Sequence, residues 1–98
     1  MTFEQLRIFL AVAERGHLSR AAEMLGMSQS GVSSAIRALE EEFRVRLFNR
    51  VGRGIELSQA GARFLPEAKA VVERAAAARL VLENASDVVA GTVSVAAS

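Results

Sequence analysis

Arginine is concentrated in one short stretch of this chain. Residues 43–63 contain five arginines and one glutamate, a net charge of +4, although the whole chain of 98 residues carries only +1. The guanidinium group presents a planar fork of N–H donors that matches phosphate oxygens and the edge of guanine. A local basic stretch of this kind is typical of phosphate binding and favours a nucleic-acid partner.

A second group of polar residues lies just before this stretch, on one face of a helix that Ser28 is expected to cap. Its members are short or flexible hydrogen-bonding side chains: Gln29, Ser30, Ser33, Ser34 and Arg37. Glutamine can pair with the edge of adenine, serine hydroxyls can bind base edges or phosphates, and arginine can reach phosphate or guanine; Ser28 joins them as a candidate contact. The opposite face carries an apolar stripe at spacings of 4, 3 and 4: Val32, Ile36, Leu39 and Phe43. This helix is therefore predicted to pack through one side and bind through the other.

Two helices are expected before this one. Residues 2–5 form a capping box that starts a helix ending at Gly16. Ser19 is expected to cap the second helix, and Arg20 in its first turn is a candidate phosphate contact. The second and third helices, joined by the short turn at residues 26–28, match a helix-turn-helix, whose second helix enters the major groove of DNA.

Residues 47–57 predict a β-hairpin, because two glycines flank Arg53 between two short apolar segments and permit a tight turn. Beside a helix-turn-helix, such a hairpin would lie next to the groove as a wing. We therefore expect Arg50 and Arg53 to contact DNA.

One long helix is predicted from Ser58 to about Ala90, closed by Gly91. At a rise of ~1.5 Å per residue, it would reach ~48 Å, too far to pack along its whole length against so small a domain. It carries an apolar seam at alternating spacings of 4 and 3: Phe64, Ala68, Val71, Ala75, Ala78, Leu82, Ala85 and Val89. Such a period indicates pairing with another helix. We expect a two-fold homodimer through residues 59–90, which requires a palindromic or near-palindromic DNA site.

Composition narrows the class of protein. Hydrophobic residues make up 51% of the chain and 18 residues are alanine, which favours a mainly α fold. With no cysteine, His17 as the one histidine and no clustered carboxylate pair, neither an enzyme nor a metal site is expected. No secretory or membrane-spanning pattern is recognised, so a cytoplasmic protein is expected. A helical dimerisation or scaffold module without nucleic-acid function stays open as the alternative, although a scaffold needs neither the basic stretch nor the glycine hairpin.

Several segments, in matching order and spacing, resemble the N-terminal domain of LysR-type transcriptional regulators: AAEML at 21–25, SQ at 28–29, Ser33, Ile36, LE at 39–40, LFNR at 47–50 and LSQAG at 57–61. The resemblance covers residues 2–90. It implies a winged helix-turn-helix over residues 1–58, a linker helix over 59–90 that pairs with another subunit's, and the start of a truncated effector-binding domain at 91–98. It also implies a small-molecule effector for that domain, no cofactor in this chain, and a tetramer of the full-length protein.

Three positions depart from the usual pattern of that family. Members often carry arginine at the position of Ser34, proline or another small residue at that of Ser30, and glycine at that of Arg44. If Arg44 takes the left-handed helix-end conformation, the strain costs about 1 kcal/mol. These departures bear on base preference, and the expected fold is unaffected.

Overall fold

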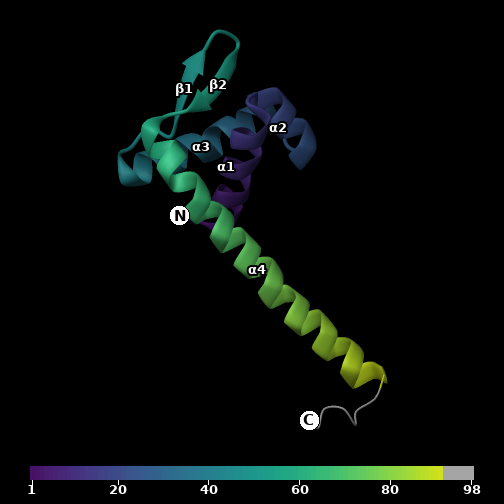
Figure 1. Cartoon of the computed structure of the whole chain (residues 1–98). Coiled ribbons are helices and arrows are strands. Elements are labelled where there is room, and N and C mark those ends of the chain that lie inside the picture. The colour runs from purple at the N-terminus through teal and green to yellow at the C-terminus, as the bar shows by residue number, and fades with distance from the viewer. Residues whose placement is uncertain (92–98) are drawn as a thin grey trace.

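The computed structural model of the chain describes residues 1–91, with side chains from residue 1 to residue 85. The elements in order are α1 (Phe3–Arg15), α2 (Leu18–Leu25), α3 (Gln29–Phe43), β1 (Phe48–Val51), β2 (Gly54–Leu57) and α4 (Gln59–Gly91). Helices α1 to α3 pack together, the β-hairpin projects from them, and α4 runs away in the other direction (Figure 1). This is the predicted mainly α, winged helix-turn-helix architecture followed by a long helix.

The first helix begins and ends where the sequence predicts. The Gln5 N–H donates to Thr2 Oγ1 at 3.0 Å, and the Thr2 N–H donates to Gln5 Oε1 at 2.8 Å, which confirms the capping box. Gly16 ends α1 in the left-handed conformation with φ 72°, a backbone state that glycine adopts without steric cost. The carbonyl of Gly16 then accepts a hydrogen bond from the Ile55 N–H at 3.2 Å, so the end of α1 also anchors the hairpin.

Serine hydroxyls start the third and fourth helices, as predicted. Ser28 Oγ accepts from the Gly31 N–H at 3.0 Å, and Ser58 Oγ accepts from the Gly61 N–H at 2.9 Å. Each bond satisfies one backbone donor that has no partner within the helix. The third helix ends at Arg44, which takes the left-handed conformation with φ 54°, the strained state that was considered for this position.

The predicted cap of the second helix is wrong. The N-cap residue is His17, whose side chain makes no capping hydrogen bond, and Ser19 is the second residue of α2. The preceding turn is so short that α2 begins two residues after α1 has ended at Gly16. Ser19 therefore lies within the first turn, where its hydroxyl cannot act as the cap.

The core is centred on Phe9, which is fully buried. Its ring lies 5.3 Å from that of Phe48 and 4.9 Å from that of Phe64, between ring centroids, so one side chain joins α1 to β1 and α4. The other buried residues come mainly from the three short helices: Leu6, Ile8, Ala11, Val12, Leu18, Ala21, Ala22, Val32, Ile36, Leu39, Leu47 and Ala68.

The apolar stripe of α3 is confirmed except at its end. Val32, Ile36 and Leu39 are buried, whereas Phe43 is 54% exposed. Phe43 is the last residue of α3, where the chain turns away, and it borders an apolar hollow of about 260 Å³ that it shares with Met1 and other residues.

The hairpin forms as predicted. β1 and β2 are antiparallel, with Phe48 opposite Leu57 and Val51 opposite Gly54. Phe48 is buried and the next three residues of β1 are exposed. The base of the hairpin is therefore part of the core, while its tip stands free of it.

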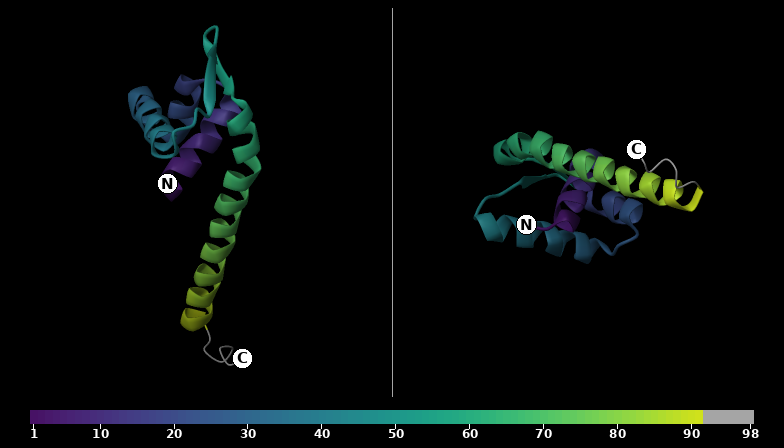
Figure 2. Two further views of the ribbon diagram at one scale, coloured as in Figure 1. Left: turned by 90° about the vertical axis from the view of Figure 1, so that its left-hand side faces the viewer. Right: turned by 90° about the horizontal axis from the view of Figure 1, so that it is seen from below.

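Helix α4 packs against α1 through its first turns and then continues alone (Figure 2). The molecule consequently measures 59 × 25 × 19 Å. No helix within residues 1–91 has the length and apolar character to cross a membrane.

The predicted apolar seam of α4 divides into two parts, which corrects the sequence-based interpretation. Phe64 is partly buried and Ala68 is 1% exposed, and both pack into the core of their own chain. Farther along, Val71 and Leu82 are 48% and 71% exposed. Val89 lies outside the residues whose side chains are described, and the strand expected at residues 92–98 lies outside the described residues altogether.

Candidate nucleic-acid interface

Helices α2 and α3 form the helix-turn-helix. The Met27 N–H donates to the Ala22 carbonyl at 2.9 Å, which closes the end of α2 before Ser28 starts α3. Because Val32 and Ile36 are buried, the opposite face of α3 is turned outward. On that face Ser33 is half-buried and the other predicted contacts are exposed: Gln29, Ser30, Ser34 and Arg37.

The hydroxyl of Ser28 has a structural role as well as its predicted one. Its Oγ accepts from the Gly31 N–H and lies 3.3 Å from Ser30 Oγ. Both hydroxyls are exposed at the N-terminus of α3, where backbone N–H groups favour an anion such as phosphate.

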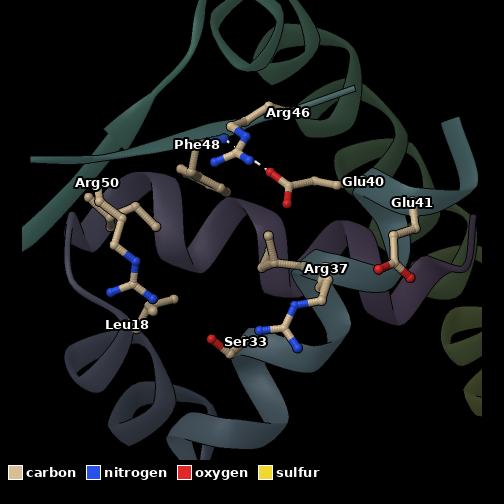
Figure 3. A pocket seen from close by; sticks show the side chains of 10 residues that line it. Leu18, Ser33, Arg37, Glu40, Glu41, Arg46, Phe48 and Arg50 are labelled. Carbon is tan, nitrogen blue, oxygen red and sulfur yellow. Dashed lines mark hydrogen bonds between the residues drawn. The ribbon is translucent and has the colours of Figure 1, made fainter. Parts of the chain in front are cut away.

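A hollow of about 390 Å³ lies between α3 and the hairpin. Figure 3 shows Arg37 and Ser33 on α3, Arg50 on β1, and Arg46 on the segment before β1 around this hollow. Its apolar lining comes from Leu18, Ile36, Phe48 and Ile55. Three guanidinium groups from separate segments therefore surround one concave surface, whose lining also includes the carboxylates of Glu40 and Glu41.

A smaller polar hollow of about 60 Å³ lies between the wing and the helix-turn-helix, and Arg53 lines it. Arg50 and Arg53 line it together with Gln29 at the start of α3 and Ser19 at the start of α2. The fold thus places Gln29, a candidate for reading bases, beside two candidates for binding phosphate.

Arg20 is not brought to these hollows. It lines a separate open depression with Arg15, Glu23 and Met24 on the outer side of α2. Arg20 is exposed, so its side chain is free to bind a phosphate, but it would do so apart from the wing arginines.

The arginines around the hollows have no intramolecular acid partner within residues 1–85. The ion pairs there join Glu42 to the N-terminus, Arg7 to Glu4, and Arg79 to Glu83. Arg37 therefore forms no ion pair with Glu40 or Glu41, the acidic residues three and four positions farther along α3. These guanidinium groups remain available to an external anion.

Two residues of this region were not among the sequence-based candidates. Arg46 lines the larger hollow; its place in the +4 stretch was the signal that could have identified it. Glu40 is half-buried, and its Oε2 accepts from the Leu47 N–H at 2.7 Å and the Phe48 N–H at 3.3 Å. No local pattern pointed to that contact, because it joins the end of α3 to the beginning of β1.

The described residues contain no group of three or more histidine or acidic side chains placed to hold a metal ion. Arginine side chains line both hollows, and His17 and Ser19 also line the smaller one. The arrangement is therefore that of a surface for binding a large anion.

Comparison with known proteins agrees with this geometry. The chain is 45% identical over 93 residues to the HTH-type transcriptional regulator ShiR of Corynebacterium glutamicum (strain R), a match that covers 95% of this chain and 32% of ShiR. It is 40% identical over 98 residues to an uncharacterized HTH-type transcriptional regulator of Azotobacter vinelandii, covering 100% of this chain and 68% of that protein. The chain therefore spans only part of these relatives.

A solved structure, the complex of CbnR_DBD with DNA, matches with a TM-score of 0.80 at 40% identity, over 88% of this chain and 99% of that one. The family described as bacterial regulatory helix-turn-helix proteins of the lysR family matches residues 3–62, from the start of α1 into the first turn of α4. The match includes every element of the helix-turn-helix and its wing. This chain belongs to the LysR family of bacterial regulatory helix-turn-helix proteins.

Proposed function

We propose that this chain is the DNA-binding and dimerisation part of a transcriptional regulator, with α3 in the major groove and the hairpin against the neighbouring backbone. The observation that carries the proposal is the convergence of Arg37, Arg46 and Arg50 around one hollow beside the polar face of α3. A solved relative of the same fold is a complex with DNA, which supports this use of the surface.

The side chains divide into two roles. Gln29, Ser30 and Ser34 are exposed on the first turns of α3, where short side chains can reach base edges. The arginines around the hollows suit phosphates. Arg37 lies at the farther end of the polar face, Arg46 lies just before β1, and Arg50 and Arg53 belong to the wing. Phosphate contacts would fix the register of the protein on the duplex and base contacts would select the sequence.

Dimerisation through α4 is the second part of the proposal. The helix leaves the seam residues Val71 and Leu82 48% and 71% exposed. Large apolar side chains in water on a lone helix favour association with a second copy. A two-fold dimer would present two recognition helices to a near-palindromic site.

The remaining part of the protein is proposed from its family alone. Because the match covers 32% of ShiR, a further domain that binds a small-molecule effector would follow α4, and the full-length protein would form a tetramer. We propose that the protein acts in the cytoplasm, and that it is not an enzyme.

Selection from a pool of random duplexes tests this function. The chain is mixed with the pool, bound duplexes are recovered from a gel shift and sequenced, and affinity for the selected duplex is compared with that for a scrambled one. Enrichment of a motif with two-fold symmetry is the expected result. If no duplex is retained at low salt, the helical scaffold without nucleic-acid function becomes the better reading.

A further inference from the structure

Glu40 fastens the start of the wing to the recognition helix. Its Oε2 accepts a hydrogen bond from the backbone N–H of Leu47 at 2.7 Å. It accepts another from the N–H of Phe48 at 3.3 Å (Figure 3). Both amides belong to the segment where the chain passes from the end of α3 into β1. One carboxylate therefore joins α3 directly to the backbone of the wing.

Two arginines lie close in sequence to the amides that Glu40 binds. Arg46 directly precedes Leu47, and Arg50 stands on the same side of β1 as Phe48, because side chains alternate along a strand. Both arginines line the hollow opposite Arg37 of α3. A change in the path of the chain at Leu47 would move the wing guanidinium groups relative to Arg37.

The charge of Glu40 is unfavourable for a surface that binds a polyanion. Its side chain lines the same hollow as the three arginines, where it would repel an incoming phosphate. Within residues 1–85 it forms no ion pair that would offset this cost. The contacts that Glu40 does make are its two hydrogen bonds from backbone amides.

We infer that Glu40 is a positioning residue for DNA binding, which holds the wing arginines in place relative to the base-reading face of α3. The inference rests on the proposed function, since it assumes that the wing lies against DNA. This role requires a side chain at position 40 that is long enough to place an acceptor oxygen at both amides. It does not require the negative charge.

Two variants separate reach from charge. Glu40→Asp keeps the charge but is one methylene shorter, so it cannot reach both amides, whereas Glu40→Gln keeps the reach and one acceptor oxygen but is neutral. Affinity for the selected duplex, measured by fluorescence anisotropy, should fall about tenfold in Glu40→Asp and stay within about threefold of wild type in Glu40→Gln. Amide hydrogen exchange at Leu47 and Phe48 should be faster in Glu40→Asp alone.

Glu41→Gln is the matched control, because Glu41 lines the same hollow while the Leu47 and Phe48 amides donate to Glu40; removing its charge should leave affinity equal to that of wild type or up to about threefold higher. Circular dichroism establishes that each variant is folded. The inference is overturned if Glu40→Asp binds as tightly as wild type, or if Glu40→Gln loses as much affinity as Glu40→Asp. If wild type itself binds no duplex, the proposed function fails, and the positioning role fails with it.

Discussion

Gly61, in the first turn of α4, lies directly against the carbonyl oxygen of Leu47. A Cβ atom at position 61 would be 2.2 Å from that oxygen and 2.9 Å from Leu57 Cδ2. The same carbonyl accepts a hydrogen bond from the Ser58 N–H at 2.8 Å. Since the N–H of Leu47 is held by Glu40, the peptide groups on both sides of Leu47 connect α3, the wing and α4.

Gly61→Ala should therefore destabilise the fold strongly. The methyl group would collide with backbone, which cannot move aside as a side chain can, and such overpacking costs about 2–3 kcal/mol. Urea denaturation followed by circular dichroism measures the change. Gln59→Ala, an exposed position in the same turn, should change stability by less than about 0.5 kcal/mol. Equal stability of the two variants would contradict the close approach.

Arg44→Gly should stabilise the protein. Arg44 has φ 54°, a left-handed conformation that is strained for a residue with a Cβ and free of strain for glycine. The expected gain is about 0.5–1 kcal/mol, because glycine also has more freedom to lose on folding. Thermal denaturation measures it. Arg44→Ala retains the strain, so a gain of the same size in that variant would point to the lost arginine side chain instead.

Gln29→Ala should weaken binding to the selected duplex more than binding to a scrambled duplex, so that the protein distinguishes the two DNA sequences less well. Gln29 is exposed at the start of α3, and loss of a base contact costs about 1–3 kcal/mol on the cognate site. Affinities for the selected duplex and for a scrambled duplex are compared with those of wild type. Equal losses on both would show that Gln29 does not read a base.

Arg53→Ala should weaken binding to all duplexes by a similar factor. Arg53 lies near the tip of the wing and lines a polar hollow with Arg50 and Gln29, as expected for a phosphate contact. Removing one such contact should lower the slope of log affinity against log salt by about one unit. An unchanged slope would exclude Arg53 from phosphate binding, and a loss limited to A/T-rich flanks would indicate insertion into the minor groove.

Leu82→Glu should shift the protein from dimer to monomer and weaken binding to the selected duplex while residues 2–57 stay folded. Leu82 is 71% exposed and belongs to the predicted seam, where a buried unpaired charge would be costly. Leu80→Glu is the control, since Leu80 is also exposed but lies about 200° away around the helix. Sedimentation equilibrium distinguishes them. A wild type that is monomeric at tens of micromolar, or a dimeric Leu82→Glu, would assign dimerisation to another surface.

Local chemistry in the sequence was enough to predict most of the elements. The capping box at Thr2 and the hydroxyl caps at Ser28 and Ser58 involve residues three positions apart, so their patterns can be recognised without knowing the fold. The same is true of the left-handed helix end at Gly16, whereas the one at Arg44 was considered only because the resembling family has glycine there. Helical periodicity then identified the buried face of α3 and, by exclusion, the polar face that lies outward.

Contacts between distant segments were decided only by the tertiary structure. The periodicity of α4 shows an apolar stripe but not what covers it, and the fold uses Phe64 and Ala68 for its own core before the stripe becomes exposed. Similarly, the sequence places Arg46 in the basic stretch and Glu40 in the LE segment at 39–40, but it does not show what either side chain contacts. Their roles depend on how the turn after α3 directs β1 back across that helix, a path set by the burial of Phe48 against Phe9, which is far away in the sequence.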